Sequence, residues 1–204
     1  MALTFPENPS GQILAVLILG FTVERFWVTF CSKRRLKSPP KKPWLTTIPI
    51  TTYLIIYFMA VIEFLSKGEE GTILTTLSFV GFLLLVIGIT LRRAAMRQFG
   101  IDWNIHVDAE AINSLVRTGP YRWIRHPYYL SVPFELVGFA LTLNAPLSAV
   151  SAFCIQAPLL LLRIAHEERE LLRKFGLGYL LYCSQAGAIF PRLSSVLQLK
   201  TRHA

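Results

Sequence analysis

The sequence predicts an all-α, polytopic membrane protein with about five transmembrane helices. Hydrophobic residues make up 53% of the 204 residues and charged residues only 16%, against roughly 25% charged in a typical soluble domain. The apolar residues also fall into long blocks, each close to the ~20 residues that a helix needs to cross a bilayer. Because backbone polar groups in lipid must be satisfied within their own segment, such blocks form helices.

The first 97 residues are predicted to hold three membrane helices. We expect these helices at about residues 10–31, 44–65 and 72–93. Three charged residues, Glu24, Arg25 and Glu63, lie within these apolar blocks. Glu24 and Arg25 are each expected to pair with a charge on another helix or to extend from near a helix end, so we predict a structural role for these two.

Residues 98–204 are predicted to form a second, catalytic region built on a helical hairpin. Its apolar stretch, residues 128–162, is too long for one span, and Asn144-Ala145-Pro146 interrupts it where a turn is expected. The hairpin limbs should lie at about residues 128–143 and 147–165. The first limb would be only ~22 Å long against a hydrocarbon core of ~30 Å, so we expect other helices to shield it or the bilayer to thin around it.

The returning limb is expected to kink at Pro158. It should then continue into water as a C-terminal helix as far as Phe175, with Gly176 as its C-cap. Both ends of a hairpin lie on the same side of the membrane. Arg125-His126 and Arg163-Glu167, one pair at each end, can therefore be neighbours.

The net charge of +9 is distributed as a membrane topology signal rather than as a nucleic-acid-binding surface. Basic residues fill the connector after the first helix, the segment after the third and the C-terminal tail, whereas the second connector is slightly acidic. By the positive-inside rule, this alternation predicts a multi-pass protein with its N-terminus outside or lumenal and its functional pocket facing the cytoplasm.

The cysteine and histidine pattern gives no indication of a metal. The three cysteines, Cys31, Cys154 and Cys183, lack metal-ligand spacing and form an odd set, so neither a zinc site nor a disulfide framework is expected. The sequence also lacks a Walker motif, a glycine-rich dinucleotide loop and a serine nucleophile elbow.

Residues 119–129 concentrate cationic and aromatic side chains directly before the hairpin. Arg125 and His126 precede Pro127, a residue suited to the first turn of a helix. The N-terminus of that helix would offer free N–H groups to a carboxylate. Nearby tyrosines could pack on a flat ring. A plain interfacial aromatic belt is the alternative explanation of this composition.

A second candidate cluster lies on the returning limb, where Arg163 and Glu167 are four residues apart and so share one helix face. A planar guanidinium suits bidentate capture of a carboxylate or phosphate, and a carboxylate suits ribose hydroxyls or an ammonium group. An ordinary surface ion pair is the alternative. The neighbouring charges are predicted to form a solvated face: Glu168, Arg169, Glu170, Arg173 and Lys174.

Residues 115–130 read Leu115-Val116-Arg117-Thr118-Gly119-Pro120-Tyr121-Arg122-Trp123-Ile124-Arg125-His126-Pro127-Tyr128-Tyr129-Leu130. This stretch resembles the signature of the isoprenylcysteine carboxyl methyltransferase and phospholipid methyltransferase superfamily. The resemblance continues through the arginine and glutamate-rich run at residues 163–171 and ends near Pro191. It therefore covers about the C-terminal half of the chain. Two small departures are Ala145, an extra residue in the turn, and His106, where the carboxyl methyltransferases have a glutamine.

This resemblance implies an S-adenosylmethionine-dependent membrane methyltransferase. It implies that Arg163 holds the acceptor carboxylate and that Glu167 contributes both to catalysis and to cofactor binding. Asn113 and Ser114 match the start of the cofactor loop. The positions that resemble the family's cofactor contacts are Leu115, Val116, Tyr121, His126, Pro127, Tyr129 and Glu167.

The predicted function is O-methylation of the carboxylate of an isoprenylcysteine-like acceptor, in contact with membrane lipids and without nucleic acid or metal. Transfer from a sulfonium depends on aligning donor and acceptor, where positioning supplies several kcal/mol. One alternative is N-methylation of a phosphatidylethanolamine-type lipid. Another is an NADPH-dependent enzyme of the sterol-reductase kind, which has a similar hairpin, and a non-catalytic membrane scaffold is the remaining one.

Overall fold

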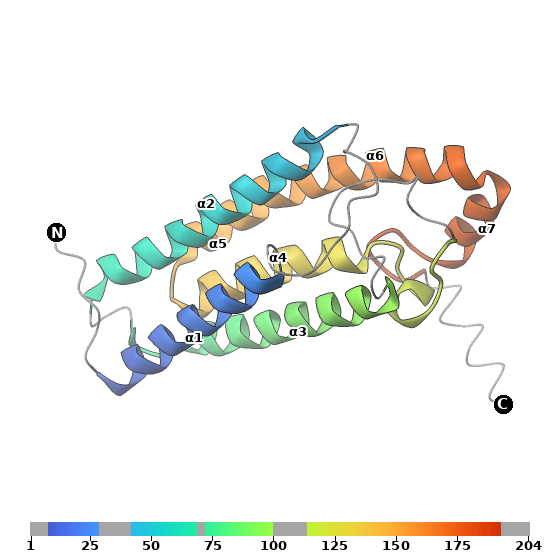
Figure 1. Cartoon of the computed structure of the whole chain (residues 1–204). Coiled ribbons are helices and arrows are strands. Elements are labelled where there is room, and N and C mark those ends of the chain that lie inside the picture. Colours follow the sequence, from blue (N-terminus) through green and yellow to red (C-terminus); the bar gives the residue numbers. More distant parts are fainter. Residues whose placement is uncertain (1–7, 29–41, 69–71, 100–113, 193–204) are drawn as a thin grey trace, which may run out of the picture.

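The computed structural model describes residues 8–28, 42–68, 72–99 and 114–192, which form an elongated helical bundle (Figure 1). Its elements are α1 (Pro9–Phe26), α2 (Trp44–Ser66), α3 (Thr76–Phe99), the 3₁₀ turn η5 (Gly119–Arg122), α4 (Pro127–Thr142), α5 (Pro146–Ser151), the π-helical turn η6 (Ala152–Gln156), α6 (Ala157–Phe175) and α7 (Leu177–Gln185). Within the described ranges, the only strand-like pairing is a single bridge between Ile124 and Gly187. The all-α prediction is confirmed for these residues.

The hairpin forms close to its predicted limits. Asn144 adopts a positive φ of 53° in the turn, and α5, η6 and α6 follow one another without a break from Pro146 to Phe175. The π-helical turn η6 lies directly before the helix that contains Pro158, the residue where a kink was expected. Gly176 ends α6 with a φ of 51°, as a glycine C-cap requires.

The third helix was predicted at residues 72–93 but begins at Thr76 and extends to Phe99. The reason is a cap: the Ser78 backbone N–H donates to Thr75 Oγ1 at 3.2 Å, and the Thr75 N–H lies 3.3 Å from Ser78 Oγ. Such reciprocal bonds satisfy the free N–H groups of a first turn. The first helix, predicted at residues 10–31, has its α-helical part at Pro9–Phe26.

Three helical stretches are long and apolar enough to cross a bilayer: Trp44–Ser66, Thr76–Phe99 and Pro146–Phe175. Large apolar side chains on their outer faces and on α1 are exposed by between 59% and 69%, among them Val16, Ile55, Phe79, Leu83, Val150 and Phe153. Exposure of apolar surface on that scale fits a protein embedded in lipid. By contrast, α4 has 16 residues, fewer than the ~20 that a full span needs, and it is enclosed by the others. These findings support an integral membrane protein; the predicted number of about five spans stays a prediction.

The helices α3 and α4 pack with their backbones almost in contact. A Cβ atom added to Gly81 would lie 2.5 Å from the Thr142 backbone nitrogen, and one added to Gly138 would lie 2.5 Å from that of Leu85. Small residues at helix interfaces allow this approach in membrane proteins. The two helices therefore form a rigid centre for the bundle.

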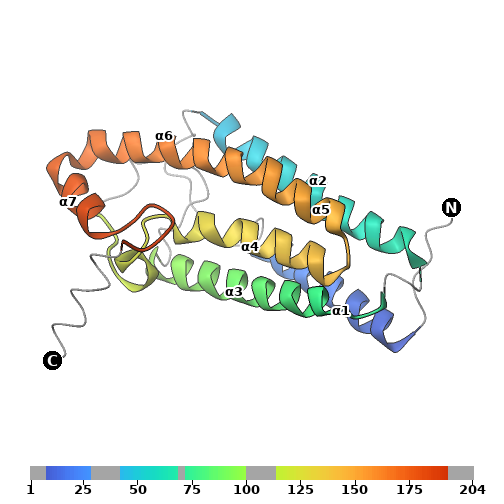
Figure 2. The same ribbon diagram turned by 180° about the vertical axis from the view of Figure 1, so that it is seen from behind.

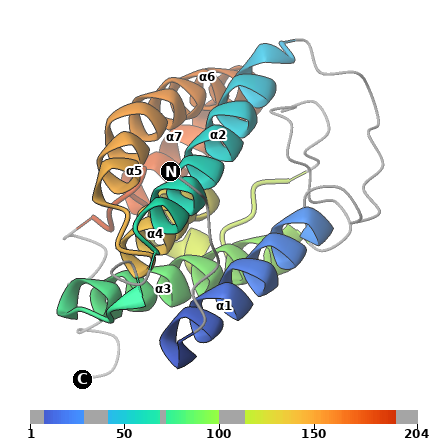
Figure 3. The same ribbon diagram turned by 90° about the vertical axis from the view of Figure 1, so that its left-hand side faces the viewer.

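The remaining helices surround that centre in two groups. On one side α2 runs beside α5 and α6, and on the other side α1 contacts α3 and α4 through its side chains (Figures 2 and 3). An aromatic stack joins α1, α2 and α4: the Phe139 ring lies 5.0 Å from that of Phe21 and 4.7 Å from that of Tyr57. Beyond the end of α6, α7 turns back toward the start of α4 and closes that end of the bundle (Figure 2).

Candidate functional site

The motif at residues 119–129 is held in place by the segment that follows α7. The Arg125 N–H donates to the Gly187 carbonyl at 2.7 Å, and the His126 N–H donates to the Ala188 carbonyl at 3.0 Å. The Tyr182 hydroxyl, buried on α7, donates to the Tyr121 carbonyl at 2.6 Å. A loop of this length could adopt many conformations alone, so these long-range bonds select one.

Pro127 begins α4, as predicted, and the motif side chains turn inward from that point. His126 is 4% exposed, and its ring stacks on that of Tyr129 with centroids 5.7 Å apart. The Tyr128 ring meets the Tyr129 ring edge-on at 5.8 Å. This burial favours a binding site over the alternative of an interfacial aromatic belt, whose side chains would face the headgroups.

Glu168 joins the motif to α6, and this contact contradicts the prediction that it belongs to a solvated face. Its Oε1 accepts from Arg125 Nε at 3.0 Å and from Arg125 Nη2 at 2.6 Å, and it lies 3.2 Å from His126 Nε2. The hydrogen bonds to His126 and Arg125 outweigh partial burial and lower the pKa of the Glu168 carboxyl to about 2. The apolar part of the helix ends at Leu162, so this pair lies beyond it. The prediction holds for Glu170 and Arg173, which form an exposed pair.

The two predicted clusters meet at Tyr129. The Arg163 guanidinium lies over the Tyr129 ring, with its Cζ 5.0 Å from the centroid, and the Tyr129 side chain interacts with both Arg163 and Glu167. Arg163 is 4% exposed. A surface ion pair, the alternative explanation for Arg163 and Glu167, would be open to water, so this burial argues against it.

Glu167 lies near a group of buried tyrosines. Tyr121 on the motif and Tyr179 on α7 both lie within its electrostatic reach, and burial raises the pKa of both hydroxyls. Among the described residues, Glu167 Oε2 and the Tyr179 hydroxyl are buried without a hydrogen-bond partner. Because buried polar atoms are nearly always satisfied, these two atoms fit a site for a ligand with ammonium or hydroxyl groups.

Among the other predicted cofactor positions, Leu115 lies beside this group. Leu115 packs against the cluster formed by Leu171, Tyr179 and Tyr182, and Val116 beside it is half-buried. Ser114 is exposed. Asn113 and His106 lie outside the described residues. Tyr179 and Glu168 were not predicted as site residues, since a tyrosine near the end of the chain and one glutamate in a charged run carry no distinctive signal.

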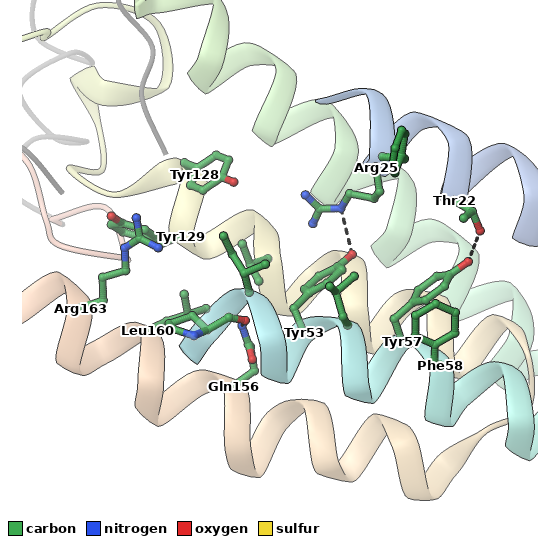
Figure 4. A pocket seen from close by; sticks show the side chains of 15 residues that line it. Thr22, Arg25, Tyr53, Tyr57, Phe58, Tyr128, Tyr129, Gln156, Leu160 and Arg163 are labelled. Atoms are coloured by element: carbon green, nitrogen blue, oxygen red, sulfur yellow. Dashed lines mark hydrogen bonds between the residues drawn. The ribbon is translucent and has the colours of Figure 1, made fainter. Parts of the chain in front are cut away.

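An elongated pocket runs from Arg163 between the helices (Figure 4). Its cavity volume is about 180 Å³. Arg163 and Tyr129 lie at one end and Thr22, Tyr57 and Phe58 at the other, with Arg25 and Tyr53 between them (Figure 4). Further lining residues are Pro49, Ile50, Leu54, Tyr128, Val132, Gln156 and Leu160.

One wall of this pocket is attached through a buried network of charges. The Arg92 guanidinium, 0% exposed, lies 2.8 Å from Glu135 Oε1 and 2.7 Å from Glu24 Oε2. Arg25 Nη2 lies 2.7 Å from Glu135 Oε2, and Arg25 Nε donates to the Tyr53 hydroxyl at 2.9 Å. Glu24 and Arg25 thus pair with charges on other helices, as predicted.

Glu63, whose role the sequence left open, caps the helix that follows the hairpin turn. Its carboxylate accepts from the Ser148 N–H at 3.0 Å and from Ser148 Oγ at 2.8 Å. Glu135 and Arg92 were missed by the sequence prediction. An ionisable residue inside an apolar run such as residues 127–142 is a usable signal for Glu135.

Fold and site together define a class: an integral-membrane-type helical protein with a buried polar site at one end of an apolar pocket. Residues 80–173 match the model of the isoprenylcysteine carboxyl methyltransferase (ICMT) family. Protein-S-isoprenylcysteine O-methyltransferase from Xenopus laevis is 32% identical over 125 residues, which are 60% of this chain and 43% of the relative. The human enzyme of that name is 33% identical over 125 residues, with 60% and 44% covered.

A solved structure of the eukaryotic intramembrane Ras methyltransferase ICMT is similar in fold. It has a TM-score of 0.72 and 22% identity, and the alignment covers 91% of this chain and 68% of that one. The chain spans less than half the length of these curated relatives. Together, the family match, the relatives and the shared fold support the assignment to the isoprenylcysteine carboxyl methyltransferase superfamily that the motif predicted.

Proposed function

We propose that this protein transfers a methyl group from S-adenosylmethionine to the carboxylate of an isoprenylcysteine-like lipid acceptor. The observation that carries the proposal is the position of Arg163, a buried guanidinium at one end of an apolar pocket and directly over Tyr129. A planar guanidinium binds a carboxylate with two parallel hydrogen bonds. The rest of the pocket would hold the tail.

The walls of the pocket suit a hydrocarbon because most polar atoms along them are already bonded within the protein. Gln156 Nε2 donates to the Pro49 carbonyl at 3.0 Å, and Gln156 Oε1 accepts from Thr52 at 2.8 Å. The Thr22 hydroxyl donates to the Ile18 carbonyl at 2.6 Å. What a ligand then meets is mainly aromatic rings and aliphatic stems, whose burial favours an apolar tail by ~25 cal/mol per Å².

The donor would occupy the group around Glu167. S-adenosylmethionine, when bound, supplies an activated methyl group on its sulfonium. On the protein side, Glu167 Oε2 and the Tyr179 hydroxyl are the buried polar atoms that a hydroxyl or ammonium group would satisfy. His126, stacked on Tyr129, would orient the ring between the donor side and Arg163. We assign the predicted contacts of Leu115, Val116, Tyr121 and Pro127 to this same side.

In this arrangement the protein acts by alignment and by exclusion of water. Arg163 would fix the carboxylate oxygen that is methylated, and Tyr129, which contacts both Arg163 and Glu167, would position that oxygen toward the donor. Burial of both sites removes competing water. Holding two reactants in line contributes ~7–11 kcal/mol in favourable cases, without a covalent intermediate on the protein.

We also propose that the site faces the cytoplasm and that the N-terminus lies outside or in the lumen. The distribution of basic residues along the sequence supports this orientation through the positive-inside rule. Cysteine-labelling of single-cysteine variants at the two ends of α2, with an impermeant reagent, would test it. Labelling of the Trp44 end from outside intact cells would contradict it.

The activity is tested by transfer of a labelled methyl group to N-acetyl-S-farnesylcysteine, the geranylgeranyl analogue and phosphatidylethanolamine. We expect methyl ester on the prenylcysteines. Arg163→Gln should reduce kcat/KM by about 100-fold or more, the effect of a lost charged contact of ~3 kcal/mol. Arg163→Lys should recover only part, because an ammonium lacks the planar fork.

Arg169→Gln is the matched control, since Arg169 is an exposed arginine on the same helix, and it should leave transfer unchanged. If phosphatidylethanolamine were the only compound methylated, the acceptor would be an amine and the proposed carboxylate acceptor would be wrong. Full turnover of Arg163→Gln would overturn the assignment of the site.

A further inference from the structure

Arg25 is the one feature of the pocket that a plain hydrocarbon tail does not explain. It lies on α1, outside the residues that match the family, and it lines the pocket between the two ends (Figure 4). Its side chain is 13% exposed. A charge at this place has to be justified by what it contacts, because ionisable groups inside a membrane protein are costly.

The contacts of Arg25 use only some of the N–H donors of its guanidinium. Nε donates to the Tyr53 hydroxyl and Nη2 pairs with Glu135, while the guanidinium plane rests near the Tyr53 ring at 4.5 Å. Among the described residues, no hydrogen bond or ion pair uses Nη1. Both N–H donors of Nη1 are therefore left on a side chain that borders the pocket.

A ligand in the pocket will cover these donors. A saturated chain would remove them from water without replacing their hydrogen bonds, which weakens binding. An oxygen at that depth would instead accept a hydrogen bond from a charged donor. The same pocket therefore discriminates between lipid tails by whether they carry an oxygen at the level of Arg25.

We propose that Arg25 is a second anchor for the acceptor and donates a hydrogen bond to an oxygen carried part-way along the apolar chain of a lipid carboxylate. This inference rests on the proposed function, in which Arg163 binds the carboxylate at the end of the same pocket. It extends the acceptor class beyond isoprenylcysteine-like lipids to elongated amphiphiles with a terminal carboxylate and a hydrogen-bond-accepting oxygen, such as a ketone or amide carbonyl, along the tail, which should bind more tightly than a plain hydrocarbon chain.

The test is a binding scan with the full chain purified in detergent. Octadecanoate is compared with a series of oxo-octadecanoates that differ only in the position of one ketone, by displacement of a fluorescent fatty acid. We expect one position to bind about 10-fold more tightly than octadecanoate, with the others equal or weaker. A tenfold change in Kd corresponds to 1.4 kcal/mol, within the range for a hydrogen bond to a charged group.

Arg25→Met should abolish this positional preference, and Arg25→Lys should weaken it. Glu135 keeps Arg92 as a partner in both variants, which favours folding. Arg93→Met is the matched control, since Arg93 is 57% exposed at the edge of the same network, and it should retain the preference. If Arg25→Met does not fold, Arg25→Lys tests the proposal in its place. An unchanged positional preference in Arg25→Lys would contradict a hydrogen bond from the planar guanidinium to the ligand oxygen.

A flat scan in the wild-type protein, or a preferred position that survives in Arg25→Met, overturns the proposal. Binding is measured without methyl transfer, so the two proposals fail separately. A positional preference in a protein that does not methylate farnesylcysteine would reject the proposed activity and retain Arg25 as an anchor. Methyl transfer to farnesylcysteine together with a flat scan would keep the proposed activity and reject Arg25 as an anchor.

Discussion

The two walls of the pocket are built in different ways. The wall formed by Tyr128, Tyr129 and Arg163 comes from a short motif and the helix that returns to it, and backbone bonds to residues 187 and 188 hold it. The opposite wall, formed by α1 and α2, is attached through long side chains: the Arg25–Glu135–Arg92–Glu24 network and the aromatic stack around Phe139.

This difference indicates that one wall serves methyl transfer and the other serves the choice of acceptor. Backbone bonds and a rigid α4 N-terminus can hold reacting groups to within a fraction of an ångström, which alignment of donor and acceptor needs. Long side chains can change rotamer, so a wall that they hold can adapt to acceptors of different shape. We therefore expect substitutions in the motif wall to affect methyl transfer and substitutions in the α1 wall to affect stability and acceptor choice.

Glu135→Leu should produce the largest effect and should appear as a loss of stability. The change leaves Arg25 without its carboxylate partner in a buried position and removes one of the two partners of Arg92. Breaking a buried ion pair on one side costs about 3–5 kcal/mol. The measurement is the free energy of unfolding in mixed micelles.

Two comparisons sharpen that result. Glu170→Gln, which removes an exposed pair with Arg173, should change stability by no more than about 0.5 kcal/mol. The double variant Arg25→Met/Glu135→Met should be more stable than Glu135→Leu alone, because no unpaired guanidinium remains at Arg25. A Glu135→Leu protein as stable as the wild type would show that the network does not hold the wall.

Glu167→Gln should give the next largest effect, this time in the motif wall and without loss of stability. Removing the charge while keeping the shape should weaken S-adenosylhomocysteine binding by about 10- to 100-fold, the range for one hydrogen bond to a charged group. Isothermal titration in detergent measures it. Equal affinity in wild type and variant would remove Glu167 from the donor site.

Glu168→Gln should have the smallest effect, about 1 kcal/mol of stability at neutral pH, typical of a hydrogen-bonded pair. Its folded pKa of about 2 lies below the ordinary value of 4.5, so the carboxylate stabilises the fold fully above pH 4.5. That contribution is lost as pH falls toward 2. The gap in melting temperature between wild type and variant should therefore close between pH 5 and pH 2.

A gap of constant size across that range would mean that Glu168 acts through packing rather than through its charge. Glu170→Gln serves again as the control, since Glu170 lies on the same helix two residues further on but pairs with the exposed Arg173.

The sequence predicted much of this because the relevant signals are local. The length of an apolar block identifies α2 and α3, Asn144-Ala145-Pro146 marks the hairpin turn, and a four-residue spacing places Arg163 and Glu167 on one face. It misplaced the start of α3, where the Thr75 cap competes with a continuous apolar pattern. It assigned Glu168 to solvent, because periodicity alone does not show which segment returns to a helix.

By itself, the sequence predicted the helical class, the membrane character and a motif that resembles a known family, since these follow from hydropathy, spacing and short patterns. The tertiary structure alone decided which charges meet. Only the packed bundle brings Glu24 and Arg25 of the first helix to Arg92 and Glu135, and Arg125 to Glu168 across 43 positions. The physical reason is that a buried charge is stable only beside its partner, and partners far apart in the chain leave no local trace.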